Sequence, residues 1–116
     1  MSAGGNAYDV NPTTGYHPTF ATGASPYTSP VGYFAANGYG LYDMAGNVLQ
    51  WCWDWYGAPY AGGADPRGPS VGSGRVLRGG LWIDGAYNCR TANRYNYGPT
   101  GSDGGLGFRS VLPSGQ

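Results

Sequence analysis

The sequence predicts a loop-rich α+β fold with little helix. Three features of its composition favour this fold: 23 Gly with 9 Pro, the absence of Lys and Glu, and 11 Tyr, 4 Trp and 3 Phe among 116 residues. Glycine and proline are the poorest helix formers, and Lys and Glu are two of the better ones. The aromatic side chains can each bury roughly 150–250 Å², which argues against a disordered chain. We therefore expect one domain, residues 1–116, held together by aromatic anchors.

The charge pattern excludes several classes of partner. Six Arg balance six Asp, so the formal net charge is +0. Without a stripe of positive charge the chain is not expected to bind nucleic acid. No apolar run approaches the ~18 residues that a membrane-spanning helix needs, so no membrane partner is expected. The N-terminal MSAGGNAYDV lacks the basic and apolar regions of a signal peptide, and the compartment stays unknown.

The first half of the chain predicts an arm, a turn and a strand. Residues 1–25 read as an extended arm, because Pro and Gly interrupt them without periodicity. His17 lies before a proline and is interpreted as a surface or packing residue. Residues 44–47 predict a tight turn with a strand after it. The cluster expected to form the main core is Trp51, Trp53, Trp55 and Tyr56.

The second half predicts two short strands separated by loops. Residues 57–74 are turn-forming throughout and predict a long surface loop. Residues 75–78 read as a short strand that ends at a Gly-Gly pair, and residues 107–112 as a closing strand. Arg78, Arg94 and Arg109 are expected to fix loops through hydrogen bonds to backbone carbonyls and Asp, and binding of a carboxylate or phosphate is the second interpretation.

Residues 81–106 have the composition of a binding loop. Tyr offers a large amphipathic contact area with few rotatable bonds, and Gly, Ser and Asn offer adaptable hydrogen bonds. Such loops on a rigid sheet are recognition surfaces more often than catalytic ones. Asp84 and Asp103 are the carboxylates of this segment, which leaves few candidates for general acid–base catalysis. The alternative is an ordinary surface loop, polar for solubility.

The chain has two cysteines, Cys52 and Cys89. The first interpretation is two buried free thiols that pack as small apolar side chains. A single disulfide between them is the second, and a metal site the third, because there is one His and no CxxC.

Several segments resemble, in composition and order, the C-terminal half of the formylglycine-generating-enzyme (sulfatase-modifying-factor) family. They are GLYDMAGNV, WCWDWY, RVLRGG with a following Trp, NCR with ANR, and GFR, within residues 26–112. The resemblance implies a C-type-lectin-like fold, a small twisted antiparallel sheet with long loops, truncated at the N-terminus. It implies either a fragment or a reduced domain that pairs with another copy, so a homo-oligomer is one expectation.

The resemblance also points to the family's catalytic cysteines. Its enzymes bind copper with two cysteines five residues apart, and the matching positions here are Asp84 and Cys89. Copper(I) prefers thiolates, so copper is not expected. If the chain is an enzyme, Cys89 is its catalytic residue. A fragment or degenerate copy of a copper-dependent formylglycine-generating oxidoreductase is therefore the second hypothesis for function.

The family also binds calcium beside the GNV turn. By residue match, the ligands here are the Asp43 and Gln50 side chains and the Gly46 and Val48 carbonyls. Gln50 stands where the family has Glu, which removes one negative charge. The alternative is that Asp43 only stabilises the turn by accepting backbone N–H bonds. Asn6 is a weaker candidate for a second site.

The variable proteins of diversity-generating retroelements belong to the same lectin-like group and carry randomised residues between RGG and GFR. Randomised Asn codons yield small residues, polar residues, Tyr, Ile or Leu. Most of the positions between RGG and GFR that the family motifs do not fix hold residues of that set. The first hypothesis is therefore a non-catalytic ligand-binding display domain for a protein or a glycan. A structural domain without a ligand is the third. The expected contact residues are Trp82, Asp84, Tyr87, Asn93, Arg94, Tyr95 and Tyr97.

Overall fold

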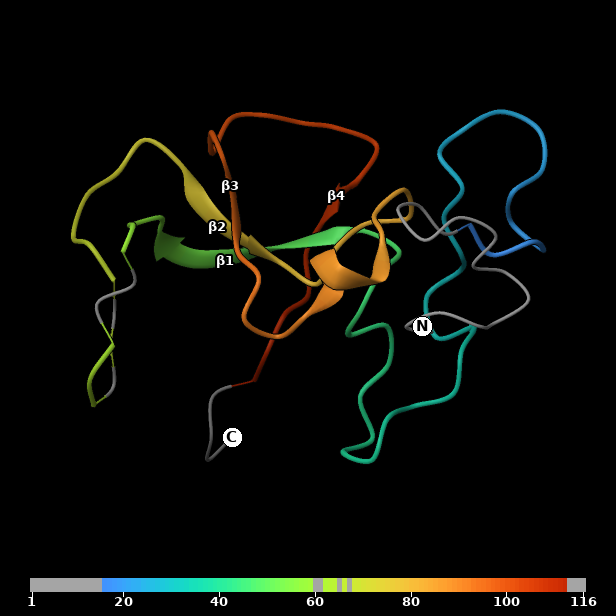
Figure 1. Ribbon diagram of the computed structural model, residues 1–116, viewed down its shortest axis with the longest axis horizontal. Coiled ribbons are helices and arrows are strands. Elements are labelled where there is room, and N and C mark those ends of the chain that lie inside the picture. The colour runs from blue at the N-terminus through green and yellow to red at the C-terminus, as the bar shows by residue number, and fades with distance from the viewer. Residues whose placement is uncertain (1–15, 60–61, 65, 67, 113–116) are drawn as a thin grey trace.

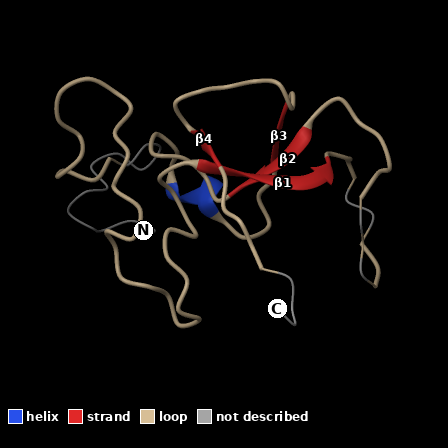
Figure 2. Ribbon diagram, turned by 180° about the vertical axis from the view of Figure 1, so that it is seen from behind, coloured by secondary structure: helices blue, strands red, loops and turns tan. Residues whose placement is uncertain are grey.

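A computed structural model describes residues 16–59, 62–64, 66 and 68–112, and its centre is a four-stranded sheet in the order β3-β2-β1-β4 (Figure 1). The elements are β1 (Leu49–Trp55), β2 (Arg75–Arg78), the 3₁₀ turn η1 (Ala86–Cys89), β3 (Tyr95–Tyr97) and β4 (Leu106–Gly107). The rest of the described chain is loop (Figure 2). Within it, no helix is long and apolar enough to cross a membrane. The predicted loop-rich fold with little helix is confirmed.

The sheet contains one parallel pair. β1 and β2 are antiparallel, as are β2 and β3, whereas β1 and β4 are parallel with Leu49 opposite Leu106. The expectation of an antiparallel sheet is therefore wrong at this edge. β3 and β4 follow each other in the chain but run in the same direction, so residues 98–105 have to return along the sheet before β4 begins (Figure 1).

The closing strand is shorter than predicted. Only Leu106–Gly107 pair with β1, and residues 108–112 lie outside the sheet. Phe108, Val111 and Leu112 are 83%, 83% and 84% exposed. The prediction of a strand over 107–112 is thus wrong beyond its first residue.

The core is aliphatic and small. Among the described residues, the buried apolar side chains are Leu49, Val76 and Leu77. The expectation of a core made by Trp51, Trp53, Trp55 and Tyr56 is wrong, since Trp53 is 86% exposed. The Arg75 guanidinium lies 3.6 Å from the centroid of the Trp55 ring and 4.8 Å from that of Trp53. These rings pack on a cation at the end of the sheet.

Residues 16–47 form loops beside the β4 side of the sheet (Figure 1). Their aromatic rings pack edge to face, with Phe20 and Tyr33 at 4.8 Å and His17 and Phe34 at 5.1 Å between centroids. This confirms His17 as a packing residue. Residues 1–15 of the predicted arm, and Asn6 with them, lie outside the described residues.

Candidate functional site

Two glycines turn the chain from β2 into the segment that sequence reasoning singled out. Gly79 and Gly80 have φ of 98° and 75°, in the left-handed region that favours glycine. A Cβ atom on Gly80 would lie 2.5 Å from Sγ of Cys89. The Gly-Gly pair is therefore needed both for the turn and for close packing against Cys89.

The Asp84 carboxylate closes the next turn. Its Oδ2 accepts a hydrogen bond from the Leu81 backbone N–H at 3.0 Å, and its Oδ1 accepts one from Asn88 Nδ2 at 3.0 Å. The Asp84 N–H donates to the Leu81 carbonyl at 3.0 Å. Both oxygens of this carboxylate thus serve the loop itself.

A chain of polar contacts holds the rest of the loop. Asn93 Nδ2 donates to the Asn88 carbonyl at 2.9 Å. Arg78 Nη1 donates to the carbonyls of Thr91 and Asn93 at 2.7 and 3.0 Å. These contacts tie the loop to β2 and confirm the structural function predicted for Arg78.

Arg94 directly precedes β3 and contacts the segment that follows β1. Its Nη2 donates to the Gly57 carbonyl at 2.9 Å, and its guanidinium lies 4.9 Å from the centroid of the Tyr56 ring. The predicted structural function of Arg94 is confirmed.

The side chains that remain exposed on this segment are large and include two tyrosines. Tyr87, Tyr97 and Ile83 are 65%, 45% and 39% exposed. Burial and the nearby Asp84 carboxylate raise the pKa of Tyr95, while the Asn93 side chain opposes the shift. Tyr97 packs near Trp51, with ring centroids 6.4 Å apart. The name tyrosine surface is used below for the exposed Ile83, Tyr87 and Tyr97, and Tyr95, predicted as a contact residue, is half-buried.

Cys89 is the last residue of η1 and is half-buried. Burial raises its pKa, the Asp84 carboxylate raises it further, and a hydrogen bond to the Gly46 backbone opposes the shift. Burial also raises the pKa of Cys52. Both cysteines are free, as the first interpretation expects, but they are half-buried and not buried. A thiol whose pKa is raised is a weak nucleophile and a weak metal ligand at neutral pH.

The calcium donors predicted at the GNV turn are engaged with other groups. Gln50 Oε1 accepts a hydrogen bond from Arg109 Nε at 2.6 Å, and Gln50 Nε2 donates to the Asp43 carbonyl at 3.0 Å. Asp43 Oδ2 accepts the Gly32 N–H at 2.7 Å. Arg109 Nη2 also donates to the carbonyls of Tyr42 and Asp43.

A guanidinium thus holds one of the two side chains that a calcium ion would need. The four-residue set at the turn, which also includes the carbonyls of Gly46 and Val48, does not fit a calcium ion well, because the ion would have to displace Arg109 from Gln50. These contacts favour the alternative, in which Asp43 stabilises the turn by accepting a backbone N–H bond. The structural function predicted for Arg109 is confirmed. Within the described ranges, no three His, Cys, Asp or Glu side chains gather closely enough to hold a metal ion.

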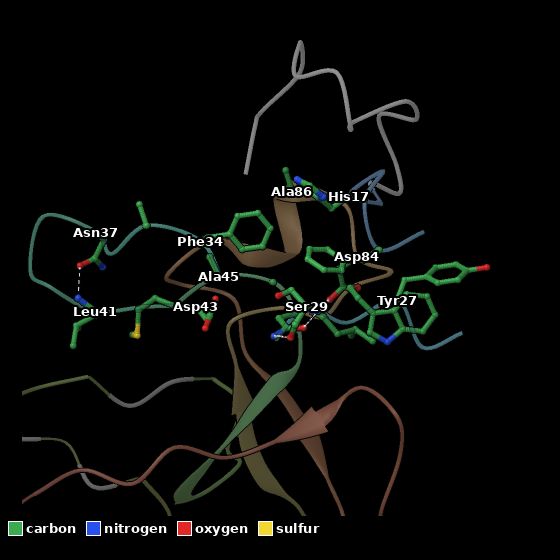
Figure 3. Close-up of a pocket in the computed structure, with 17 residues that line it drawn as sticks. His17, Tyr27, Ser29, Phe34, Asn37, Leu41, Asp43, Ala45, Asp84 and Ala86 are labelled. Carbon is green, nitrogen blue, oxygen red and sulfur yellow. Dashed lines mark hydrogen bonds between the residues drawn. The ribbon is translucent and has the colours of Figure 1, made fainter. Parts of the chain in front are cut away.

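Beside the loop is a pocket of about 410 Å³ (Figure 3). Trp82 and Asp84 line it from the predicted contact set, and most other lining residues come from 17–47. Ser29 Oγ and Trp82 Nε1 are buried there without a hydrogen-bond partner. Sequence reasoning missed this pocket, because residues 17–47 have no periodicity. The one available signal was the density of aromatic residues.

Comparison with known proteins fixes the family. Residues 4–113 match the sulfatase-modifying factor enzyme 1-like domain. The chain belongs to this family. The formylglycine-generating enzyme of Thermomonospora curvata is 42% identical over 106 residues, which are 82% of this chain and 35% of that enzyme. A serine/threonine-protein kinase, pkn1, of Chlamydia caviae is 45% identical over 87 residues, or 71% of this chain and 14% of the kinase.

Among solved structures, this sulfatase-modifying-factor-like chain is similar to Treponema denticola variable protein 1. The TM-score is 0.63 with 46% sequence identity, over 70% of this chain and 30% of that one. The resemblance to the family, variable proteins included, is therefore confirmed. The chain spans about a third of the length of the formylglycine-generating enzyme and of the variable protein.

Proposed function

We propose that this chain is a non-catalytic display domain that binds a protein or a glycan through the tyrosine surface. The observation that carries the proposal is that, within residues 81–105, the side chains that fix the loop differ from the side chains that are exposed. Asn88 and Asn93 use their side chains to hold the loop, whereas Tyr87 and Tyr97 stand exposed. Exposed tyrosines on a fixed backbone bind with little loss of conformational entropy.

The similarity to a protein named a variable protein supports this reading. A surface that varies must tolerate substitution without loss of the fold. The tyrosine surface meets this condition, since the hydrogen bonds that fix the loop come from Arg78, Asn88 and Asn93 and not from its own side chains.

The test is a library of the full chain randomised at the tyrosine surface and selected for binding to a purified protein such as lysozyme. We expect folded, protease-resistant members and specific binders among them. A matched library randomised at Arg78, Asn88 and Asn93 should be largely unfolded. A tyrosine-surface library that is equally unfolded, or folded but without binders, would overturn the proposal.

The second candidate is a copper-dependent formylglycine-generating oxidoreductase, favoured by the 42% identity to such an enzyme. Asp84 in place of a cysteine and the raised pKa of Cys89 argue against it. Incubation of the full chain with copper, oxygen and a cysteine-containing peptide, followed by mass spectrometry, distinguishes the two. The display proposal predicts no aldehyde product.

A further inference from the structure

The walls of the pocket beside the loop are aromatic (Figure 3). The edge-to-face contact of Tyr27 with Trp82, at 5.3 Å between centroids, and that of His17 with Phe34, at 5.1 Å, hold these rings in place. Aromatic faces carry partial negative charge and attract cations, above all when the site is shielded from water. The lining rings are His17, Phe20, Tyr27, Phe34 and Trp82.

The charge of the pocket has the same sign as the ring faces. Asp43 and Asp84 line it, and none of the described arginines does. The hydrogen bonds to the two carboxylates come from neutral donors: the Gly32 N–H to Asp43, and the Leu81 N–H and the Asn88 amide to Asp84. Arg109 contacts the Asp43 carbonyl and not its carboxylate. The carboxylates therefore make the pocket attractive to a cation.

Two buried polar atoms in the lining residues lack a partner. Ser29 Oγ can accept a hydrogen bond, and Trp82 Nε1 can only donate one. Leaving such atoms unpaired costs free energy, so a ligand that pairs with them gains affinity. The pair of atoms suits a ligand that carries both an N–H or cationic group and an oxygen acceptor.

We propose that this pocket binds an organic ammonium cation that carries an oxygen acceptor, the chemistry shared by choline and by a lysine residue. The inference does not depend on the tyrosine surface, because most of the lining comes from residues 17–47. The rings surround the cation, the carboxylates balance its charge, and Trp82 Nε1 donates to the ligand oxygen.

The first experiment titrates the full chain by calorimetry. The probes are choline, N-acetyl-lysine-methylamide and 3,3-dimethylbutanol, a neutral analogue of choline. We expect one or both cations to bind and the neutral analogue not to. The cation that binds more tightly identifies the source of the ammonium group. No binding by either cation, or equal binding by the neutral analogue, would overturn the proposal.

The second experiment removes the charges. Asp43→Asn keeps an oxygen acceptor for Gly32 and a residue that tolerates the φ of 52° found at Asp43. Asp43→Asn and Asp84→Asn should each weaken binding of the preferred cation about tenfold. Asp54→Asn, at an exposed position of β1, is the matched control and should bind as the wild type does. Unchanged affinity in both pocket variants would contradict the proposal.

A third comparison separates this pocket from the display surface. Trp82→Phe keeps an aromatic ring and removes the N–H, so it should weaken cation binding. Tyr87→Ala alters the tyrosine surface alone and should leave it unchanged. Loss of cation binding in Tyr87→Ala, with Trp82→Phe unaffected, would assign the ammonium group to the tyrosine surface and overturn the pocket proposal.

Discussion

By the resemblance to the family, Asp84 is expected to stand where the family's enzymes have one of their two cysteines. Its oxygens are bonded to the Leu81 N–H and the Asn88 amide, so it serves the loop and leaves Cys89 as an unpaired thiol with a raised pKa. On that expectation, Cys89 alone does not supply the pair of thiolates that copper(I) prefers.

Asp84→Cys should restore copper(I) binding. A second thiolate five residues from Cys89 gives the soft ligand pair that copper(I) prefers. Competition with a chromophoric copper(I) chelator should show stoichiometric binding by the variant and none by the wild type or by Asp84→Cys/Cys89→Ser. Equally tight binding of copper(I) by the wild type would instead support the copper-dependent oxidoreductase.

The raised pKa values of the two cysteines predict that the folded chain loses stability at alkaline pH. Burial raises the pKa of Cys52 and of Cys89 in the folded chain. The contribution of the two thiols to the free energy of unfolding is fully present below the ordinary thiol pKa of about 8.5. It is lost as the pH rises through their pKa values in the folded chain. The melting temperature should fall above about pH 8.5, and less steeply in Cys52→Ala/Cys89→Ala. Identical slopes for both proteins would contradict this assignment.

At the scale of elements, the turn after β2 depends on Gly80. Gly80 and Gly23 both have positive φ, 75° and 74°, but a Cβ on Gly23 would meet nothing within 4 Å, whereas one on Gly80 would meet Cys89 Sγ at 2.5 Å. Chemical denaturation should show a loss of about 1 kcal/mol for Gly23→Ala, from backbone strain. Gly80→Ala should cost a further ~1–3 kcal/mol from overpacking. Equal losses would contradict the close packing of Gly80 on Cys89.

The turn before β1 is expected to depend on Arg109 and not on calcium. Arg109 donates to Gln50 Oε1 and to the carbonyls of Tyr42 and Asp43. Arg109→Ala should lower the free energy of unfolding by about 1–3 kcal/mol. Added calcium or EDTA should leave the wild-type melting temperature unchanged. A calcium-dependent rise that Asp43→Ala abolishes would instead establish the calcium site.

Local sequence patterns predicted where the strands lie better than they predicted which segments contact one another. The Gly-Gly pair after RVLR marked the end of β2, and the apolar segment after the GNV turn marked β1. The parallel pairing of β4 and the exposure of Trp53 depend on contacts between distant segments. In particular, the alternation in WCWDW carries no sign that Arg75, twenty residues later, stacks on two of its rings.

The same limit applies to the site. The binding-loop composition of residues 81–106 marked Tyr87 and Tyr97 as exposed. Asp84 and Asn93, which were expected as ligand contacts, instead form hydrogen bonds within the loop. The pocket is built from segments about fifty residues apart, and no local pattern joins them.

At the scale of the whole molecule, the described part buries few apolar side chains and exposes several large ones. Trp53, Phe108, Val111 and Leu112 are 83–86% exposed, while three apolar residues are buried. Large apolar side chains that are exposed to this extent are available to contact another copy of the chain. The expected homo-oligomer therefore remains our prediction for the purified chain.

Sedimentation velocity tests that prediction. The chain should associate as its concentration rises, and Phe108→Ser/Leu112→Ser should shift it to monomer by removing apolar contact area. Val71→Ser, also at an exposed site (76%), is the control and should not shift it. A wild type that is monomeric at every concentration would contradict self-association.

The central claim is that the fold of residues 81–105 and the surface it presents are separable. A stability scan of all single substitutions, read as protease resistance of the full chain, tests it most directly. We expect tolerance at Ile83, Tyr87 and Tyr97, and loss of folding at Arg78, Asn88 and Asn93. Equal sensitivity in the two groups would contradict it.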